Sequence, residues 1–483
     1  MTYLKQIIKF VLFLFLLAAF DLQATGQTFA QMIARLNSLP LTQRQAVADS
    51  FMNSGQPIPM IESDTIVHFA YNSASQSVSM AGDATGWNPN AIFSNIAGTT
   101  FWYYTTSYET DARLDYKFVI NGSNWILDPK NPHTCTGGFG PNSELRMPGF
   151  AYPPDIAFYG SIPHGIITDT TIHSNILGNT RQVRVYLPPG YPAGSEAYPV
   201  ILFHDGLDYI NLGKACNILD YLISQHLVSP VIAVFVPAID RSAEYAGSKI
   251  DNFTAFITTE LMPVIDSKYK TSKDPARRAM AGASDGGNIS LYIGMKHPGQ
   301  FGKIAAQSSD VISSISSAFS GGPKLNLELY LDIGTYDIPI LIPMVYGLRD
   351  ILLGNGYAFQ FHEWHEGHSW GNWMGHLRLP LMQFFPWSSG LNDLPGNGRL
   401  KLDQNRPNPF REHTMIRFSG APGAKMELTL FDLSGRFVDT IYSGSVLKTE
   451  NSLEYFHTKP AGEYILTLKE NGMVMNSIII QAL

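Results

Sequence analysis

The chain has 483 residues, which is long enough for two or three domains. Hydrophobic residues make up 45% of it, as globular domains require, whereas charged residues make up only 15%. The net charge of −7, with no block of Lys and Arg, argues against nucleic acid and anionic membrane surfaces as partners.

The two cysteines, Cys135 and Cys216, fall in different predicted domains, so we do not expect a disulfide between them. Two thiols cannot form a cysteine-rich metal site. We also predict no metal or other cofactor, on the basis of the side-chain chemistry predicted below.

Residues 1–26 predict a secretory signal peptide. Lys5 and Lys9 give a positive start, and the apolar run over 10–20 is short for a bilayer span. Small residues at 24–26 suit cleavage. We expect a secreted or cell-surface protein with no stable membrane span after processing; a retained membrane anchor is the alternative.

Residues 27–59 predict two short helices before the first domain. Apolar residues recur at helical spacing over 29–36, and Pro40 interrupts the pattern. Thr42 is a candidate cap for a second helix over 43–52.

Residues 60–150 predict a small antiparallel β-sandwich, because alternating strands are separated by turn residues at 86–89 and 121–122. The stretches 81–88 (Ala-Gly-Asp-Ala-Thr-Gly-Trp-Asn) and 115–122 (Asp-Tyr-Lys-Phe-Val-Ile-Asn-Gly) resemble the early-set immunoglobulin-like domain of carbohydrate-binding module family 48. In binding members, tryptophans stack on sugar rings, and the resemblance implies this role for Trp87 and Trp125. The alternative is that both tryptophans belong to the core or face the next domain.

Residues 158–390 predict an α/β domain. The apolar runs at 199–203 and 231–236 have the composition of strands buried on both faces, and strands alternate with helices up to residue 364. Such alternation predicts a mostly parallel sheet with right-handed crossovers. In these sheets the active site lies beyond the carboxyl ends of the strands.

The stretch 281–287 reads Ala-Gly-Ala-Ser-Asp-Gly-Gly. A strand is predicted before it, over 277–280, and a helix after it, over 288–295. A G-x-S-x-G pattern in this context is typical of a nucleophile elbow, with Ser284 as nucleophile and the N–H of Asp285 as an oxyanion donor. The alternative is a loop rich in Gly and Ser.

A serine needs a base and an orienting acid. His368 follows the last apolar strand and is favoured as the base, with His365 as its competitor. Asp337 follows Gly334 and is favoured as the acid, whereas Asp332 is interpreted as a buried structural residue.

The second oxyanion donor should come from the loop after the His-Asp-Gly sequence at 204–206. Gly206 permits close approach of the backbone, so we predict the N–H of Leu207 as that donor.

Six stretches of this domain together resemble the esterase D family. They are 185–191 (Val-Tyr-Leu-Pro-Pro-Gly-Tyr), 204–206, Arg241 with 244–245 (Glu-Tyr), 260–263 (Glu-Leu-Met-Pro), 282–287 and 366–370 (Glu-Gly-His-Ser-Trp). That family contains feruloyl and acetylxylan esterases and enterochelin esterases. The resemblance implies an α/β-hydrolase fold, a triad of Ser284, Asp337 and His368, and substrate binding by Arg241 and Trp370.

Asp285 departs from the pattern of this family, in which many members have an apolar residue after the nucleophile. A carboxylate at this position opposes a developing oxyanion unless it points away.

Residues 400–483 predict a second small β-sandwich. The stretches 404–410 (Gln-Asn-Arg-Pro-Asn-Pro-Phe), 431–436 (Phe-Asp-Leu-Ser-Gly-Arg) and 461–465 (Ala-Gly-Glu-Tyr-Ile) resemble the type A C-terminal sorting domain of the type IX secretion system. The resemblance implies that the secretion machinery is a partner and that the tail is removed or used for attachment. Another carbohydrate-binding module is the alternative.

The fold class predicted is therefore α/β: an α/β-hydrolase domain flanked by an N-terminal immunoglobulin-like β-sandwich and a C-terminal small β-sandwich. The predicted function is a secreted serine esterase that removes feruloyl or acetyl groups from a plant polysaccharide such as xylan. The alternatives are a siderophore ester hydrolase and a non-catalytic protein that binds surface glycans.

Overall fold

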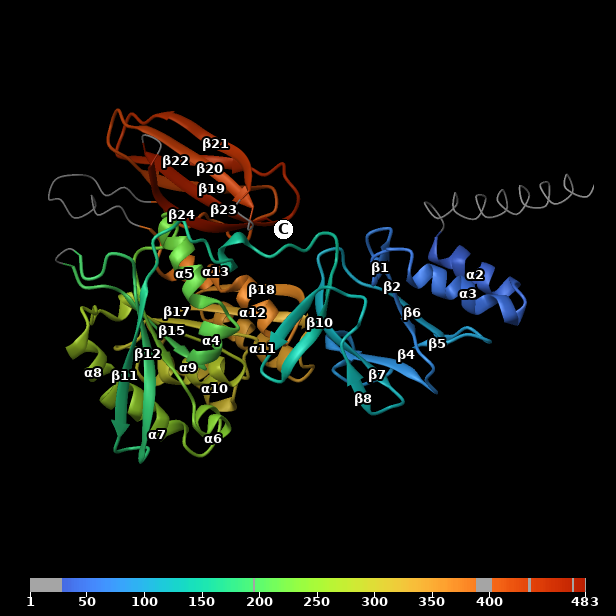
Figure 1. Cartoon of the computed structure of the whole chain (residues 1–483). Coiled ribbons are helices and arrows are strands. Elements are labelled where there is room, and N and C mark those ends of the chain that lie inside the picture. Colours follow the sequence, from blue (N-terminus) through green and yellow to red (C-terminus); the bar gives the residue numbers. More distant parts are fainter. Residues whose placement is uncertain (1–27, 194–195, 388–401, 433–435, 471–472, 483) are drawn as a thin grey trace, which may run out of the picture. The chain divides into compact units, whose positions relative to one another are not determined.

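The computed structural model describes residues 28–193, 196–387, 402–432, 436–470 and 473–482 (Figure 1). The predicted signal peptide and the predicted domain boundaries at 390 and 400 lie outside these ranges. In the described ranges no helix is both long and apolar enough to cross a membrane. The chain divides into two compact units, residues 1–134 with 142–150 and residues 135–141 with 151–483.

The first unit begins with helices α2 (Phe29–Ser38) and α3 (Leu41–Met52). Thr28 caps α2, because its side chain accepts a hydrogen bond from the N–H of Gln31. The second helix starts earlier than predicted: Pro40 holds the cap position, and Thr42 lies inside the helix. Proline suits this place because it has no N–H that needs a helical partner.

Strands follow, as the alternating pattern predicted. They are β1 (Met60–Glu62), β2 (Ile66–Asn72), β3 (Val78–Gly82), β4 (Ala91–Ile92), β5 (Ser94–Asn95), β6 (Phe101–Ser107), β7 (Arg113–Ile120), β8 (Asn124–Ile126) and β10 (Gly140–Arg146). The short strand β9 (Thr134–Gly137) falls mostly in the segment 135–141, which belongs to the second unit. One sheet has the order β1-β2-β6-β5, and in a second layer β7 pairs with β3, β8 and β10, all antiparallel. The turn from β7 to β8 is made by Asn121 and Gly122, both with positive φ, as an Asn-Gly hairpin requires.

The second unit contains a sheet in which helices and strands alternate. Its strands are β11 (Ile166–Ser174), β12 (Asn179–Leu187), β13 (Val200–His204), β14 (Ile232–Val236), β15 (Arg278–Ala283), β16 (Lys303–Gln307), β17 (Glu328–Tyr336) and β18 (Ala358–Gly367). They lie in the order β11-β12-β14-β13-β15-β16-β17-β18. The strands from β14 to β18 are parallel, and β11 and β12 add an antiparallel edge.

The helices of this sheet are α4 (Gly206–Asn211), α5 (Ala215–Ser224), α6 (Arg241–Tyr245), α7 (Ile250–Ala255), the π-helical segment η3 (Phe256–Leu261), α8 (Met262–Lys268), α9 (Asp285–Lys296), α10 (Ser313–Gly321), α11 (Leu341–Gly354), α12 (Trp370–His376) and α13 (Arg378–Phe384).

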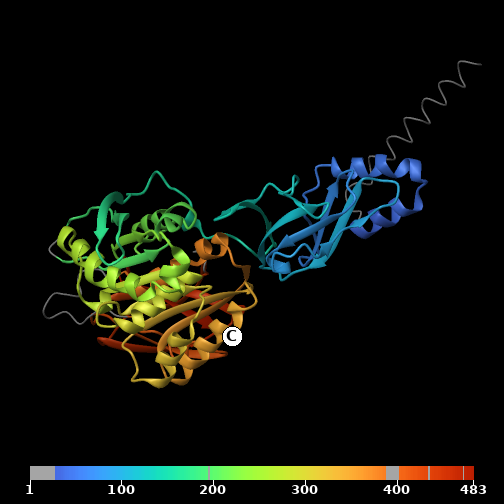
Figure 2. The same ribbon diagram turned by 90° about the horizontal axis from the view of Figure 1, so that it is seen from below.

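Both faces of the parallel strands are buried, which explains their nearly continuous apolar runs. Alternate residues of β13 illustrate this: Leu202 belongs to one core cluster, and Phe203 belongs to the other. Helices α8, α9, α10 and α11 cover the first face, and α4, α5, α12 and α13 cover the second. Figure 2 shows helices lying against this sheet. The sheet with helices on both faces is the α/β-hydrolase architecture that the sequence predicted.

The C-terminal strands are β19 (His413–Ser419), β20 (Lys425–Asp432), β21 (Phe437–Ser445), β22 (Glu450–Phe456), β23 (Gly462–Glu470) and β24 (Met473–Ala482). Strands β19 and β22 pair with each other, and β21-β20-β23-β24 form a second antiparallel sheet. One core of buried apolar residues, among them Ile416, Leu428 and Leu466, joins these strands.

Candidate active site

Ser284 stands at a sharp turn between β15 and α9. Its φ of 58° and ψ of −129° are strained for a residue with a side chain. Its N–H donates to the carbonyl oxygen of Gln307 at the end of β16, over 2.9 Å. This is the strand, turn and helix context that the G-x-S-x-G pattern predicted. The helix is longer than the predicted range 288–295, because α9 runs from Asp285 to Lys296.

The turn is tight enough to require glycine beside the serine. A Cβ atom on Gly282 would lie 2.1 Å from the carbonyl oxygen of Gly286, which is backbone and cannot rotate away. We expect Gly282→Ala to lower the free energy of unfolding by about 1–3 kcal/mol, because the turn must open to admit the methyl group. Thermal unfolding measures this. Gly347→Ala is the control, because a Cβ atom there meets nothing within 4 Å; an equal loss in both variants would contradict the prediction.

Asp337 and His368 form the second part of the site. Asp337 follows β17, and its side chain has no exposed surface. Its Oδ1 accepts hydrogen bonds from Nδ1 of His368 and from the N–H of Ile338, both over 2.7 Å. His368 follows β18, and 17% of its side chain is exposed. Because a carboxylate can only accept, Nδ1 carries the proton and Nε2 is left with its lone pair.

A run of contacts links this imidazole to the turn that holds Ser284. The Trp373 ring packs edge-on against His368, with ring centroids 5.0 Å apart, and its Nε1 donates to Oγ of Ser308 over 3.0 Å. Ser308 directly follows Gln307, which binds the Ser284 N–H. In the described part of the chain the Ser284 hydroxyl makes no hydrogen bond of its own. Such bonds are often long in unliganded sites and shorten when substrate binds.

Asp332, the alternative acid, lies inside β17 and is fully buried. Its carboxylate accepts from the N–H of Ser308 and from the hydroxyl of Tyr330. Burial raises the pKa of Asp332 to about 6. These contacts join neighbouring strands and make Asp332 the buried, hydrogen-bonded structural residue that the sequence indicated.

The other histidines of this region have different surroundings. His365 lies within β18 itself. His362 is 3% exposed and hydrogen-bonds to Glu463. His376 pairs with Glu366 over 2.6 Å. Among these histidines, His368 is therefore the one that the structure places against the predicted acid.

Leu207 and Asp285 each lie in the first turn of a helix, α4 and α9 respectively. Amide N–H groups in a first turn have no partner inside the helix and can donate to a ligand. The two helices follow the adjacent strands β13 and β15. A Cβ atom on Gly206 would lie 2.3 Å from backbone atoms of Phe235, so glycine is required where α4 starts.

The predicted substrate-binding side chains have different exposure. Trp370 is 8% exposed and packs edge-on against Tyr209 and Trp373, so it belongs to the core and offers no open face to a sugar. This corrects its predicted role. Trp125 is 43% exposed on β8, whereas Trp87 is half-buried and donates from Nε1 to Asp83.

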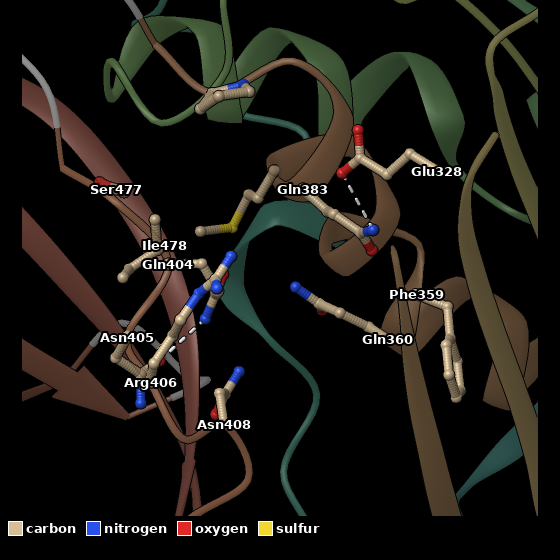
Figure 3. A pocket seen from close by; sticks show the side chains of 12 residues that line it. Glu328, Phe359, Gln360, Gln383, Gln404, Asn405, Arg406, Asn408, Ser477 and Ile478 are labelled. Carbon is tan, nitrogen blue, oxygen red and sulfur yellow. Dashed lines mark hydrogen bonds between the residues drawn. The ribbon is translucent and has the colours of Figure 1, made fainter. Parts of the chain in front are cut away.

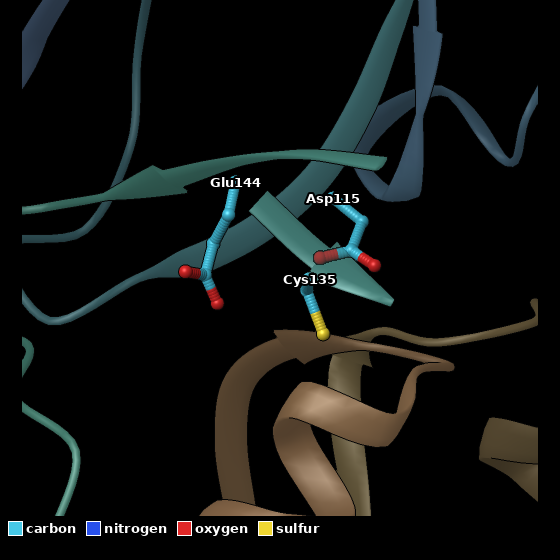
Figure 4. Close-up of side chains that lie close together, drawn as sticks. All are labelled: Asp115, Cys135 and Glu144. Atoms are coloured by element: carbon cyan, nitrogen blue, oxygen red, sulfur yellow. The ribbon is translucent and has the colours of Figure 1, made fainter. Parts of the chain in front are cut away.

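Two other groups of polar side chains lie together outside this site. Asp115 and Glu144 on the first sandwich (Figure 4) each pair with Arg113 at 2.5 Å, so both carboxylates already have a cationic partner. In the second unit, a pocket of about 360 Å³ is lined largely by polar side chains, among them Gln360, Gln383 and Arg406 (Figure 3). None of the predicted catalytic residues lines it.

The chain is similar in sequence to several known proteins. The model of the putative esterase family matches residues 174–378. An uncharacterized protein of Bacillus subtilis, YjcH, is 30% identical over 183 residues, which are 37% of this chain and 76% of that protein. An endo-1,4-beta-xylanase/feruloyl esterase of Xylanibacter ruminicola is 28% identical over 268 residues, which are 51% of this chain but only 35% of that protein.

The iron(III) enterobactin esterase of Escherichia coli is 26% identical over 239 residues, which are 44% of this chain and 59% of that protein. Among solved structures, the enterobactin esterase of Shigella flexneri has a TM-score of 0.59 at 22% identity, covering 70% of this chain and 97% of that one. This likeness supports the α/β-hydrolase fold.

Proposed function

This chain belongs to the putative esterase family and is a carboxylic ester hydrolase, and we propose that it releases feruloyl or acetyl groups from an uncharged plant polysaccharide such as xylan. The observation that carries the mechanism is the hydrogen bond of 2.7 Å between Asp337 and His368, on loops that follow strands near the Ser284 turn.

In the proposed mechanism, Nε2 of His368 removes the proton from the Ser284 hydroxyl as its oxygen attacks the ester carbonyl. Asp337 keeps the ring in the required tautomer and stabilises the imidazolium. The N–H groups of Leu207 and Asp285 donate to the oxyanion. His368 then protonates the departing alcohol oxygen of the sugar, and water attacks the acyl-serine by the same route in reverse. These steps need no metal or other cofactor.

Charge near Ser284 favours an uncharged substrate. Asp205, Asp208, Asp285 and Asp310 all follow the carboxyl ends of β13, β15 and β16. Burial raises the pKa of Asp205, the Arg241 guanidinium opposes this rise, and the charges of Asp208 and Asp285 add to it. Arg241 is shared between two of the four carboxylates, so they outnumber the cation that pairs with them.

The two groups of named relatives suggest different substrates. A xylanase/feruloyl esterase supports the polysaccharide proposal, and the enterobactin esterases support a siderophore ester. A siderophore with three catecholate groups is anionic when it holds iron, and the carboxylates around Ser284 would repel it. For this reason we favour the polysaccharide.

The proposal is tested by giving purified protein methyl ferulate, acetylated xylan and a triscatecholate siderophore ester, and by measuring released acid. We expect turnover of one or both of the first two substrates at rates well above that of the third. Siderophore hydrolysis alone would favour the siderophore ester as substrate, and binding to xylan without hydrolysis of any ester would contradict the proposed function.

Esters with an uncharged and a charged acyl group test the effect of the carboxylates near Ser284 directly. We expect kcat/KM for p-nitrophenyl butyrate to exceed that for p-nitrophenyl hemisuccinate by about tenfold or more, because the extra carboxylate of the second acyl group approaches like charges. Asp208→Asn should narrow this ratio, whereas Asp350→Asn, at an exposed site on α11, should not. Equal kcat/KM for both esters, at low and at high salt, would contradict the prediction.

We also propose that the protein is exported, on the basis of the signal pattern over 1–26 and the sorting motifs within 400–483. Under this proposal the type IX secretion machinery is its partner, and the mature protein is secreted or held at the cell surface. The N-terminal sandwich would contact glycan through Trp125, whose indole is the more exposed of the two predicted tryptophans.

A further inference from the structure

We infer that Arg241 is a positioning residue: its guanidinium fixes the two oxyanion donors relative to each other and neutralises the carboxylate beside the nucleophile. This inference rests on the proposed function, in which Leu207 and Asp285 donate to the oxyanion. It gives Arg241 a different task from the substrate binding that the sequence predicted.

All three nitrogens of the Arg241 guanidinium have partners within the protein. Nε donates to both carboxylate oxygens of Asp205, at 3.1 and 3.0 Å. Nη1 donates to Oδ2 of Asp285 at 2.7 Å. Nη2 lies 3.0 Å from Oδ2 of Asp205 and 3.3 Å from the carbonyl oxygen of Ala283. Little hydrogen-bonding capacity is left for a substrate, although 39% of the side chain is exposed.

These partners belong to the two backbone segments that supply the proposed oxyanion donors. Asp205 precedes the first turn of α4, which contains Leu207, and it has a left-handed φ of 54°. Ala283 and Asp285 directly flank Ser284. One planar group therefore holds both segments, which come from β13 and β15. Oxyanion stabilisation depends on donors held in place before the reaction, so the bracing bears directly on the rate.

Arg241 also neutralises the side chain of Asp285. Its carboxylate follows the nucleophile and would oppose a developing oxyanion. In the structure Oδ2 of this carboxylate accepts a hydrogen bond of 2.7 Å from Nη1 of Arg241, so a cation neutralises its charge. The departure from the family pattern at Asp285 is thus matched by its partner at Arg241.

The test is a double-mutant cycle on p-nitrophenyl acetate with Arg241→Met, Asp285→Asn and both together. We expect Arg241→Met to lower kcat about 100-fold with KM changed less than threefold, because the oxyanion donors and not substrate binding are affected. Asp285→Asn alone should lower kcat less than Arg241→Met does, because Arg241 keeps its contacts with Asp205 and with the carbonyl oxygen of Ala283. The double variant should recover about tenfold over Arg241→Met, since the carboxylate that directly follows the nucleophile is then gone and only Asp205 is left without its cation.

Arg349→Met is the matched control. Like Arg241, Arg349 pairs with an aspartate, Asp350, and lies over a tyrosine ring, Tyr346, but it is on α11. Its kcat should equal that of the unmodified protein. Arg241→Lys should be intermediate, because an ammonium keeps the charge but cannot reproduce the planar fork.

An unchanged kcat in Arg241→Met, or a rise in KM alone, overturns the inference. A double variant no faster than Arg241→Met overturns the charge part of it. If Arg241→Met does not fold, Arg241→Lys decides the matter, and full activity in that variant overturns the inference. If Arg241→Met keeps the kcat of the unmodified protein while Ser284→Ala is inactive, this inference is wrong but the proposed function is still supported.

Discussion

Replacing Ser284 by alanine is expected to lower kcat/KM for p-nitrophenyl acetate by about 10⁴- to 10⁶-fold, because no other group in the proposed mechanism can form the acyl intermediate. The residual rate would come from the oxyanion donors and substrate binding. The fold should be kept, since the Ser284 side chain makes no hydrogen bond within the described residues and is half-buried. Initial rates with purified protein, together with labelling by a fluorophosphonate, measure the effect.

A serine on α10 provides the control. Ser314 is exposed and distant in sequence from the proposed triad, so Ser314→Ala should retain full activity and full labelling. Thermal unfolding of both variants should match that of the unmodified protein. Activity or labelling that persists in Ser284→Ala would show that another residue is the nucleophile, and the proposed mechanism would fail.

The elements that could be predicted from the sequence are those with local signals. The turn at Ser284 is specified by Gly282, whose absent Cβ atom lets the backbone of Gly286 in α9 pack back on β15. The parallel strands are specified by apolar runs, because both of their faces must be buried. Asp337 was preferred over Asp332 by its position after the strand, and the structure brings Asp337 against His368.

The features that could not be predicted depend on contacts between distant residues. The partners of Arg241 are brought together by the pairing of β13 with β15 and by the loop after β14, and no local pattern encodes that arrangement. The family resemblance implies substrate binding by Trp370, but its burial against Tyr209 is a tertiary effect. A tryptophan in a glycine-rich motif carries no signal that separates core from ligand contact.

Asp337→Asn is expected to lower kcat/KM about 10⁴-fold while leaving the fold intact. An asparagine keeps the shape of the side chain, and an amide oxygen in the place of Oδ1 would still accept from His368 and Ile338, but it would carry no negative charge to stabilise the imidazolium. If the NH₂ group faces the ring, Nδ1 must accept and the proton moves to Nε2. Nε2 can then no longer take the proton of Ser284. KM should change little, because no substrate contact is lost.

Asp332→Asn tests whether Asp332, the alternative acid, orients His368 in place of Asp337. Asp332 accepts from Ser308 and Tyr330 in the interior of the sheet, so its replacement should lower the free energy of unfolding by about 1–3 kcal/mol and reduce kcat much less than Asp337→Asn. Under the proposed mechanism, Asp337→Asn loses more kcat, whereas Asp332→Asn loses more of the free energy of unfolding. Measurements of kcat and of chemical unfolding on both variants test this. If Asp332→Asn is the slower enzyme and Asp337→Asn retains activity, Asp332 is the orienting acid, and the hydrogen bond between Asp337 and His368 serves only to hold the last loop.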